Sequence, residues 1–343
     1  MSKIGRFMKV CKLNKGELKG YLTNWIRNYY SDVVVGDGFV YARGNMNVLL
    51  TAHMDTVHDE SLKKYITVSK KKEDGRVLHT LTSKQGIGGD DRCGVYMIMK
   101  IVERGYRPFI LFCEDEEIGG VGSKKFVETN YITELEKMLF LVELDRAHDK
   151  DLVYYDDDNK EFHSFCEEVT GYKESYGSFS DISVLSPYCM VSSVNISCGY
   201  YNAHHLDEYV VFEEMEDSIE ATIKLLDASK NLEKGFEYEE HIYTRGYGYY
   251  GYGYGYNSNL YQAYKNEKSE LYYEYDGDNC EDWYQKIEDK ANEEPEKVKA
   301  WIFMLEDGSE VEALGRSLQE AIGQLMIENC ELSWSMVMDY YMY

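Results

Sequence analysis

The chain has 343 residues and a formal net charge of −25 at pH 7, from 62 acidic and 37 basic side chains. A protein this acidic is not expected to bind nucleic acid or an anionic membrane surface. Hydrophobic residues make up 44% of the chain, enough for a folded core, and no bilayer-spanning run or signal-peptide segment is seen, so we expect a soluble, cytoplasmic protein.

The first 82 residues are predicted to form a helix followed by short strands. Residues 16–30 place Leu18, Leu22 and Trp25 on one face of an amphipathic helix. Residues 47–51, with the sequence NVLLT, have a continuously apolar centre, as in a strand covered on both faces. Further strands are expected at residues 32–35 and 39–43, and a hairpin at residues 65–69 and 77–81.

Helices and strands then alternate as far as residue 232. Strands are expected at residues 109–113, 138–142 and 190–197, and helices at residues 92–102, 123–128, 160–168 and 212–232. Such alternation is typical of βαβ units, in which helices cover both faces of a parallel sheet. We therefore predict an α/β fold for residues 1–235, a three-layer α/β/α sandwich with a mainly parallel central sheet.

The composition changes near Gly235, which predicts two further segments. Residues 236–292 are rich in Tyr and Gly, with the run GYGYYGYGYGY, and are interpreted as a low-complexity linker. Residues 293–343 are expected to form a small α+β appendage of ββαβ type and unknown role. Its predicted elements are a strand at 298–305, a turn at Asp307-Gly308, a helix that begins at the capping box of Ser317 and Glu320, and a strand at 334–341.

The first two polar segments of interest follow a strand and a glycine-rich turn. His53, just after the strand at 47–51, could be a metal ligand, with Asp55 bound to its other ring nitrogen. The alternative is a histidine that only satisfies its hydrogen bonds at a strand end. Asp90 and Asp91 end a glycine-rich turn before a helix, where either could simply be an N-cap.

Three more segments follow predicted strands. Glu116 and Glu117 belong to an acidic run directly after the strand at 109–113; such runs are usually solvated, but like charges held together require a cation or raised pKa values. Asp145 and His204 follow later strands, and alone they could be a surface ion pair and a polar loop. Ligands bind at the carboxyl ends of strands in open α/β sheets. Two His and three carboxylates form a ligand set suited to two adjacent zinc-type ions.

These segments, in this order, resemble the co-catalytic di-zinc exopeptidases, which include aminopeptidases, peptidase T and glutamate carboxypeptidases. The resemblance covers about residues 45 to 210. The matching pieces are TAHMDTV, GIGGDDRCGV, EDEEIGGVGS, VELD and YNAHHLDEY, with GSFSDIS as a weaker match.

The resemblance implies a role for each candidate residue. One metal would be held by His53, Asp90 and Asp145, and a second by Asp90, Glu117 and His204, so that Asp90 bridges the two. Asp55 would orient His53, and Glu116 would be the general base. The resemblance also implies two divalent ions, with Zn2+ expected first and Co2+ or Mn2+ as alternatives, and a cis peptide bond between Asp90 and Asp91.

The spacing of the motifs bears on the substrate. Asp145 and His204 are only 59 residues apart, which leaves no room for the lid domain inserted in many carboxypeptidase-like relatives. Residues 1–235 therefore resemble the compact aminopeptidase form, and hydrolysis of the N-terminal bond of peptides is expected. Asp115 and Asp181 are candidate rim residues that would attract the free amine.

Two alternatives remain. A carboxypeptidase or N-acyl amino acid deacylase of the same superfamily would need a cation for the substrate carboxylate, and Arg92 and Arg146 are the nearby arginines. In a different class, the chain could be a non-catalytic binding or assembly protein that its metal site stabilises. The C-terminal region could then bind a protein partner or a second copy of the chain through its tyrosines.

Overall fold

The computed structural model describes residues 2–73, 75–241, 299–305, 310–315 and 337–342. The chain divides into two compact units, Met1–Asn266 and Glu267–Tyr343. Among the described helices, none has the length and apolar character needed to cross a membrane.

The first unit is built on an eight-stranded, mainly parallel sheet. The strand order is β1-β2-β6-β3-β7-β10-β8-β9. Strands β6, β3, β7 and β10 are parallel to one another, and β1, β2 and β8 join the sheet through antiparallel pairs. The strands are β1 Val33–Gly36, β2 Phe39–Ala42, β3 Met46–His53, β6 Pro108–Cys113, β7 Phe140–Arg146, β8 Asp151–Val153, β9 Lys173–Glu174 and β10 Ser193–Ser197.

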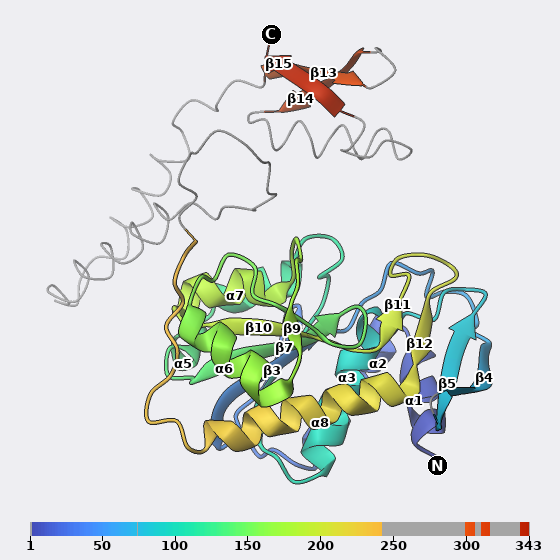
Figure 1. The fold of residues 1–343 in the computed structure, drawn as a ribbon, viewed down its shortest axis with the longest axis vertical. Coiled ribbons are helices and arrows are strands. Elements are labelled where there is room, and N and C mark those ends of the chain that lie inside the picture. The colour runs from blue at the N-terminus through green and yellow to red at the C-terminus, as the bar shows by residue number, and fades with distance from the viewer. Residues whose placement is uncertain (1, 74, 242–298, 306–309, 316–336, 343) are drawn as a thin grey trace, which may run out of the picture. The chain divides into compact units, whose positions relative to one another are not determined.

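Helices cover both faces of this sheet, because neighbouring residues of each central strand point to opposite sides. Leu50 and Val142 belong to one apolar core and Leu49 and Leu141 to a second. One core contains α1 Lys3–Cys11, α2 Lys15–Ile26, α3 Gly89–Glu103, α6 Lys160–Thr170 and α8 Phe212–Ser229; the other contains α4 Val121–Val127, α5 Ile132–Leu135 and α7 Asp181–Cys189. Helices α7 and α8 accordingly lie on opposite sides of β3, β7 and β10 (Figure 1). The predicted three-layer α/β/α sandwich is confirmed.

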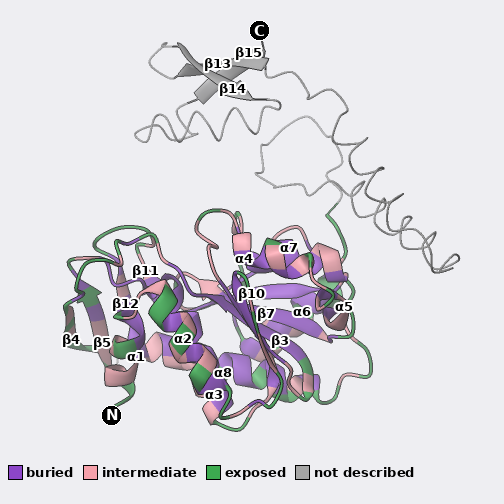
Figure 2. Ribbon diagram, turned by 180° about the vertical axis from the view of Figure 1, so that it is seen from behind, coloured by how far each residue is buried: buried purple, intermediate pink, exposed green. Residues whose placement is uncertain are grey.

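A second, smaller sheet has the strand order β11-β12-β5-β4 and is antiparallel throughout. It contains the predicted hairpin, whose strands β4 Ile66–Glu73 and β5 Arg76–Ser83 are longer than expected. Strand β4 is largely exposed, unlike the buried strands of the central sheet (Figure 2). Strands β11 Tyr200–Tyr201 and β12 Tyr209–Val211 flank the segment that carries His204.

Several short or irregular elements were not predicted. They are α1, α5, α7 and strands β8, β9, β11 and β12. Strands of two or three residues have too few side chains to show an alternating pattern. Helix α7 contains Pro187, a residue that ordinarily ends a helix.

Helix α3 packs unusually closely on the central sheet at Gly94. A Cβ atom on Gly94 would overlap the backbone carbonyl oxygen of Leu144 in β7. We expect Gly94→Ala to lower the free energy of unfolding by about 1–3 kcal/mol, because neither backbone can move away freely. Gly20 in α2 has no heavy atom within 4 Å of the position that a Cβ would occupy, so Gly20→Ala should instead stabilise the protein by about 0.5–1 kcal/mol. Urea unfolding of both variants measures the difference, and equal effects would contradict this close packing.

The second unit contains a three-stranded antiparallel sheet with the order β14-β13-β15. Strands β13 Lys299–Leu305 and β15 Val337–Met342 correspond to the two predicted strands, and β14 is Glu310–Gly315. The predicted turn at Asp307-Gly308, the helix after Ser317 and residues 242–292 of the predicted linker lie outside the described residues. The domain boundaries at 235 and 292 stay a prediction. The described residues just after 235 belong to the first unit, in which Glu237 pairs with Val191.

Candidate metal centre

The candidate residues meet at the carboxyl edge of the central sheet. Strands β3 and β6 run in parallel and end in register, with His53 beside Cys113. Glu116 and Glu117 follow the end of β6, and Asp145 lies near the end of β7. His204 comes from the loop between β11 and β12. Segments that are far apart in the sequence are thereby brought to one place.

His53 is fully buried at the centre of this group. Its Nε2 atom lies 3.0 Å from Asp90 Oδ1 and 3.4 Å from Asp145 Oδ1. Its other ring nitrogen, Nδ1, lies 3.4 Å from Asp55 Oδ1. The ring therefore presents Nε2 to two carboxylates, while Asp55 faces the opposite edge.

Asp55 also contacts the acidic segment after β6. Its two carboxylate oxygens accept the backbone N–H groups of Glu116 and Glu117, each at 3.2 Å. Burial alone would raise the pKa of Asp55, but hydrogen bonds from His53 and from these backbone groups outweigh it and lower the pKa to about 2. An ionised Asp55 thus fixes both the His53 ring and the position of the two glutamates.

The two consecutive aspartates at the start of α3 have different surroundings, and the peptide bond between them is cis, as expected. Asp90 Oδ1 faces His53, and Asp90 Oδ2 lies 3.2 Å from His204 Nε2. Asp91 instead accepts the backbone N–H groups of Gly94, at 2.8 Å, and of His53, at 3.2 Å. Asp91 therefore acts as a helix N-cap, the alternative role considered for both aspartates, whereas Asp90 lies between the two histidines.

Two buried carboxylate oxygens in this group have no hydrogen-bond partner, Glu117 Oε1 and Asp145 Oδ1. Glu117 Oε2 lies 3.1 Å from His204 Nε2. Ligands of a tetrahedral zinc ion lie roughly 3.3–3.6 Å from each other, close to the spacing of these atoms. Asp145 Oδ1 and Glu117 Oε2 face imidazole nitrogens at this spacing, and Asp145 Oδ1 and Glu117 Oε1 lack hydrogen-bond partners. Both observations fit a divalent metal ion.

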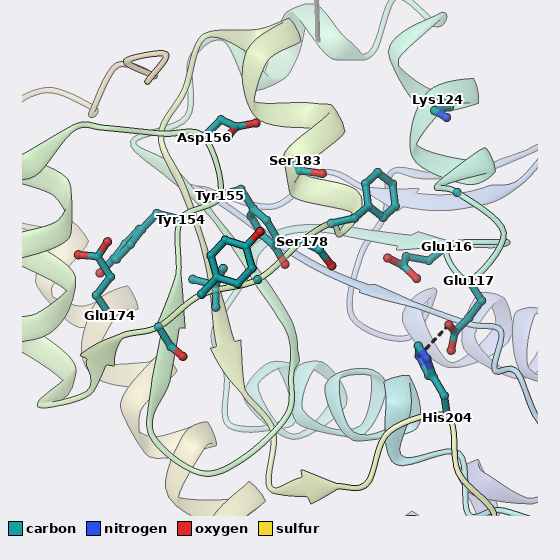
Figure 3. A pocket seen from close by; sticks show the side chains of 16 residues that line it. Glu116, Glu117, Lys124, Tyr154, Tyr155, Asp156, Glu174, Ser178, Ser183 and His204 are labelled. Carbon is teal, nitrogen blue, oxygen red and sulfur yellow. Dashed lines mark ion pairs between the residues drawn. The ribbon is translucent and has the colours of Figure 1, made fainter. Parts of the chain in front are cut away.

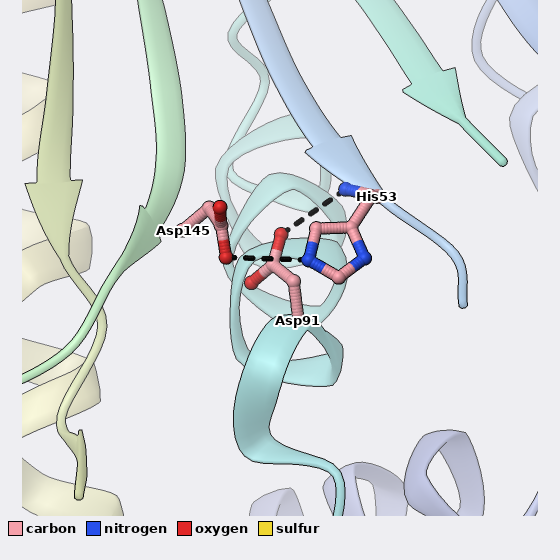
Figure 4. Close-up of side chains that lie close together, drawn as sticks. All are labelled: His53, Asp91 and Asp145. Carbon is pink, nitrogen blue, oxygen red and sulfur yellow. Dashed lines mark hydrogen bonds and ion pairs between the residues drawn. The ribbon is translucent and has the colours of Figure 1, made fainter. Parts of the chain in front are cut away.

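Among the residues that the structure describes, two sets of three side chains have potential ligand atoms that all lie within 4.8 Å of one another: His53, Asp91 and Asp145 (Figure 4), and His53, Asp90 and Glu117. Both sets differ from the predicted ones: Asp91 takes the place of Asp90 in the first, and His53 takes the place of His204 in the second. Both oxygens of Asp91 already accept backbone N–H groups, so we favour Asp90 as the ligand. Buried His, Asp and Glu side chains that could bind metal are thus present at this edge.

The crowding of carboxylates raises several pKa values. Burial raises the pKa of Glu116 to about 10, helped by repulsion from Asp145, Asp181 and Asp90, although His53 lowers it. Burial and the nearby Asp90 raise the pKa of Asp145 to about 7. Hydrogen bonds to Asp90 and Glu117 raise the pKa of His204 to about 11. A cation bound among these carboxyl groups would relieve the repulsion that raises the pKa values of Glu116 and Asp145.

A cavity of about 820 Å³ opens beside this group. Glu116, Glu117 and His204 lie at one side of it, and Tyr154, Asp156 and Glu174 lie at the other (Figure 3). The remaining lining residues are Gly119, Lys124, Val153, Tyr155, Ser175, Tyr176, Gly177, Ser178, Phe179 and Ser183. The cavity is thus lined by aromatic and acidic side chains, with one lysine.

The predicted rim residues do not line this cavity. Asp181 is fully buried at the start of α7, so the prediction that it lies on the rim is wrong: the apolar side chains around it pack this end of α7 into the core. Asp115 forms an ion pair with Lys15.

Both arginines considered for a substrate carboxylate have structural partners. Arg92 is fully buried, pairs with Glu60 and donates to the backbone oxygens of Leu13, Met54 and Asp55. Arg146 pairs with Asp151. Neither side chain lines the cavity.

The structure adds residues that sequence reasoning did not place in the site. Ser180 donates its hydroxyl to Asp145 Oδ2 at 3.0 Å, and Asn195 accepts the Asp145 backbone N–H at 2.9 Å. Glu208 and His58 contact the turn that carries Asp90. For Glu208 and His58, the only signal in the sequence was their spacing from His204 and from His53, respectively.

Comparisons with known proteins show the fold. No protein-family model matches the chain, and no curated protein matches it. The crystal structure of aminopeptidase PepT from Bacillus cereus is similar, with 14% sequence identity and a TM-score of 0.51, over 67% of this chain and 98% of that one. A tripeptidase from Staphylococcus aureus has 12% identity, a TM-score of 0.51 and the same coverage. The predicted resemblance is confirmed at the level of the fold: the chain has a zinc exopeptidase-like fold.

Proposed function

We propose that the chain is a metal-dependent exopeptidase that removes N-terminal residues from peptides with the help of two divalent ions. The observation that carries this proposal is the position of Asp90, whose two carboxylate oxygens face His53 and His204 respectively. A carboxylate between two histidines, each with a second carboxylate beside it, is the arrangement that two neighbouring ions require.

The chain's own residues divide into two ligand groups around Asp90. His53 and Asp145 would complete one group, and Glu117 and His204 the other. Two divalent ions bound there, with zinc as the first candidate, would lower the pKa of a water molecule and polarise the scissile carbonyl. Asp55 and Ser180 hold the His53 ring and the Asp145 carboxylate in place from outside these groups.

Glu116 is the proposed general base. Its Oε2 atom lies 4.0 Å from His53 Nε2, farther than the carboxylates of Asp90 and Asp145, and its side chain lines the cavity. The raised pKa of Glu116 would be lowered by two divalent cations bound beside it, so that an ionised Glu116 could accept the proton of the attacking water and pass it to the leaving amine. The adjacent Glu117 faces His204, so the two consecutive glutamates are suited to different tasks.

The charges around the cavity support aminopeptidase over carboxypeptidase activity. Four carboxyl groups line it, from Glu116, Glu117, Asp156 and Glu174. A free α-amino group is a cation and is attracted to such a site. For a substrate carboxylate, Lys124 is the one lysine or arginine among the lining residues, because Arg92 and Arg146 are engaged elsewhere.

Metal analysis and a peptide panel test the proposal together. We expect purified protein to contain about two zinc-like ions per chain and to release N-terminal residues from free-amine peptides, with activity lost on chelation and restored by metal. Cleavage of N-acetylated but not free-amine peptides would favour the carboxypeptidase or deacylase alternative. Bound metal without turnover on either panel would favour a metal-stabilised binding protein, and absence of metal would contradict the whole proposal.

A further inference from the structure

Glu208 is a fully buried carboxylate outside both proposed ligand groups. Its Oε1 atom accepts the backbone N–H of Asp90 at 3.0 Å, and its Oε2 atom accepts the backbone N–H of Gly88 at 2.8 Å. It lies four residues after His204, in the same loop between β11 and β12. One side chain of the loop that carries His204 therefore binds the backbone of the turn that carries Asp90.

His58 supplies the third hydrogen bond to this carboxylate. Its Nε2 atom lies 2.7 Å from Glu208 Oε2, and both side chains are buried. The His58 ring also lies directly against Gly86, whose φ of +72° already favours glycine and where a Cβ atom would overlap the ring. His58 is five residues beyond His53, so the contact joins a third ligand-bearing segment to the same turn.

We propose that Glu208, supported by His58, is a positioning residue that holds the Gly86–Asp90 turn so that the Asp90 carboxylate lies between His53 and His204. This inference rests on the proposed function, because it concerns the geometry of the proposed ligands. Glu208 touches no reacting atom; it acts through the backbone of Gly88 and Asp90. Its separation of 150 residues from His58 means that only the folded chain forms this contact.

The chemistry of the contact requires a carboxylate. All three partners of Glu208 approach with nitrogen atoms, and a carboxylate group offers acceptor lone pairs on both of its oxygens. Glutamine has the same shape but replaces one oxygen by an NH2 donor. In either amide orientation, at least one N–H of the turn or of His58 would then face another donor, which is costly in a buried site.

Glu208→Gln tests the inference in the full-length protein, with Zn2+ affinity measured by competition with a chromophoric chelator. We expect the affinity to fall about 10- to 100-fold, as is typical when a residue that orients metal ligands is lost. The visible absorption spectrum of the Co2+-substituted protein should change, because the ligand geometry changes. In peptide hydrolysis at saturating metal, kcat should fall more than KM rises.

A matched control is available at a second His–Glu pair. Glu213 accepts from His79 Nδ1 at 2.5 Å and from the His79 backbone N–H at 2.6 Å, away from the site. Glu213→Gln should leave Zn2+ affinity and the Co2+ spectrum unchanged. Thermal unfolding of both variants shows whether each has folded, since a purely structural role would lower stability without altering metal affinity or the spectrum of the folded protein.

His58→Gln keeps the inference testable if Glu208→Gln does not fold. A glutamine at 58 can still donate to Glu208, so a smaller loss of Zn2+ affinity is expected than for His58→Ala. Wild-type affinity and spectrum in folded Glu208→Gln, or in both His58 variants, would overturn the positioning role. If the wild-type protein itself binds no Zn2+, the proposed function fails first, and the two failures are thereby distinguished.

Discussion

Replacing Glu116 by glutamine should leave the metal content of the protein unchanged and lower its peptidase turnover by about 10²- to 10⁴-fold. Glutamine preserves the size of the side chain but cannot accept a proton from water. The metal should be retained because Glu116 is farther from His53 Nε2 than Asp90 and Asp145 are. Elemental analysis together with kcat on a free-amine peptide measures both parts of the expectation.

Glu114→Gln is the matched control for this experiment. Glu114 belongs to the same acidic run, but its Oε2 atom pairs with Lys19 Nζ at 2.6 Å, and it does not line the cavity. We expect near wild-type turnover from this variant. Retained turnover in Glu116→Gln would refute the assignment of Glu116 as the general base. Loss of metal from the same variant would indicate that Glu116 is a metal ligand.

Asp90→Asn should have the largest effect on metal binding, with both ions weakened by at least about 100-fold and peptidase activity reduced to background. The two oxygens of Asp90 lie 3.0 Å from His53 Nε2 and 3.2 Å from His204 Nε2. Asparagine keeps only one oxygen, and its amide group offers no lone pair to a second cation. Zinc titration of the apo protein measures the loss at each of the two sites.

Asp91→Asn separates the two consecutive aspartates. Its two oxygens accept the backbone N–H groups of His53 and Gly94. Asparagine keeps one acceptor but turns the other into a donor that faces a backbone N–H, so it should lower the free energy of unfolding by about 1–3 kcal/mol and leave zinc bound. If Asp91→Asn loses zinc while Asp90→Asn retains it, the ligand assignment is reversed.

The sequence predicted the central architecture because the strands of a buried parallel sheet are unusually easy to recognise. Residues 48–50 and 109–113 are apolar without interruption, since both faces of β3 and β6 are covered there. The polar residues that follow such strands stand out against them. Strand ends of a parallel sheet share one edge, so the sequence alone was enough to place His53, Glu117 and Asp145 together.

Other features depend on contacts that no local pattern contains. An aspartate at the start of a helix can be a cap or a ligand, and only the partners of Asp90 and Asp91 distinguish the two cases. Arg92 resembles a substrate-binding cation in the sequence, yet it is fully buried and donates to backbone oxygens of three other residues. Asp181 likewise gave no sign of being buried.

The hydrogen bonds of Asp55 imply that substitutions around the site will not act independently. Because one carboxylate is shared by the His53 ring and the backbone of Glu116 and Glu117, a change at Asp55 displaces a proposed ligand and the proposed base at once. In a double-mutant cycle, Asp55→Asn combined with Glu116→Gln would cost much less than the sum of the single changes. Selection would then act on these two segments together, so that a tolerated replacement in one limits which replacements the other can accept.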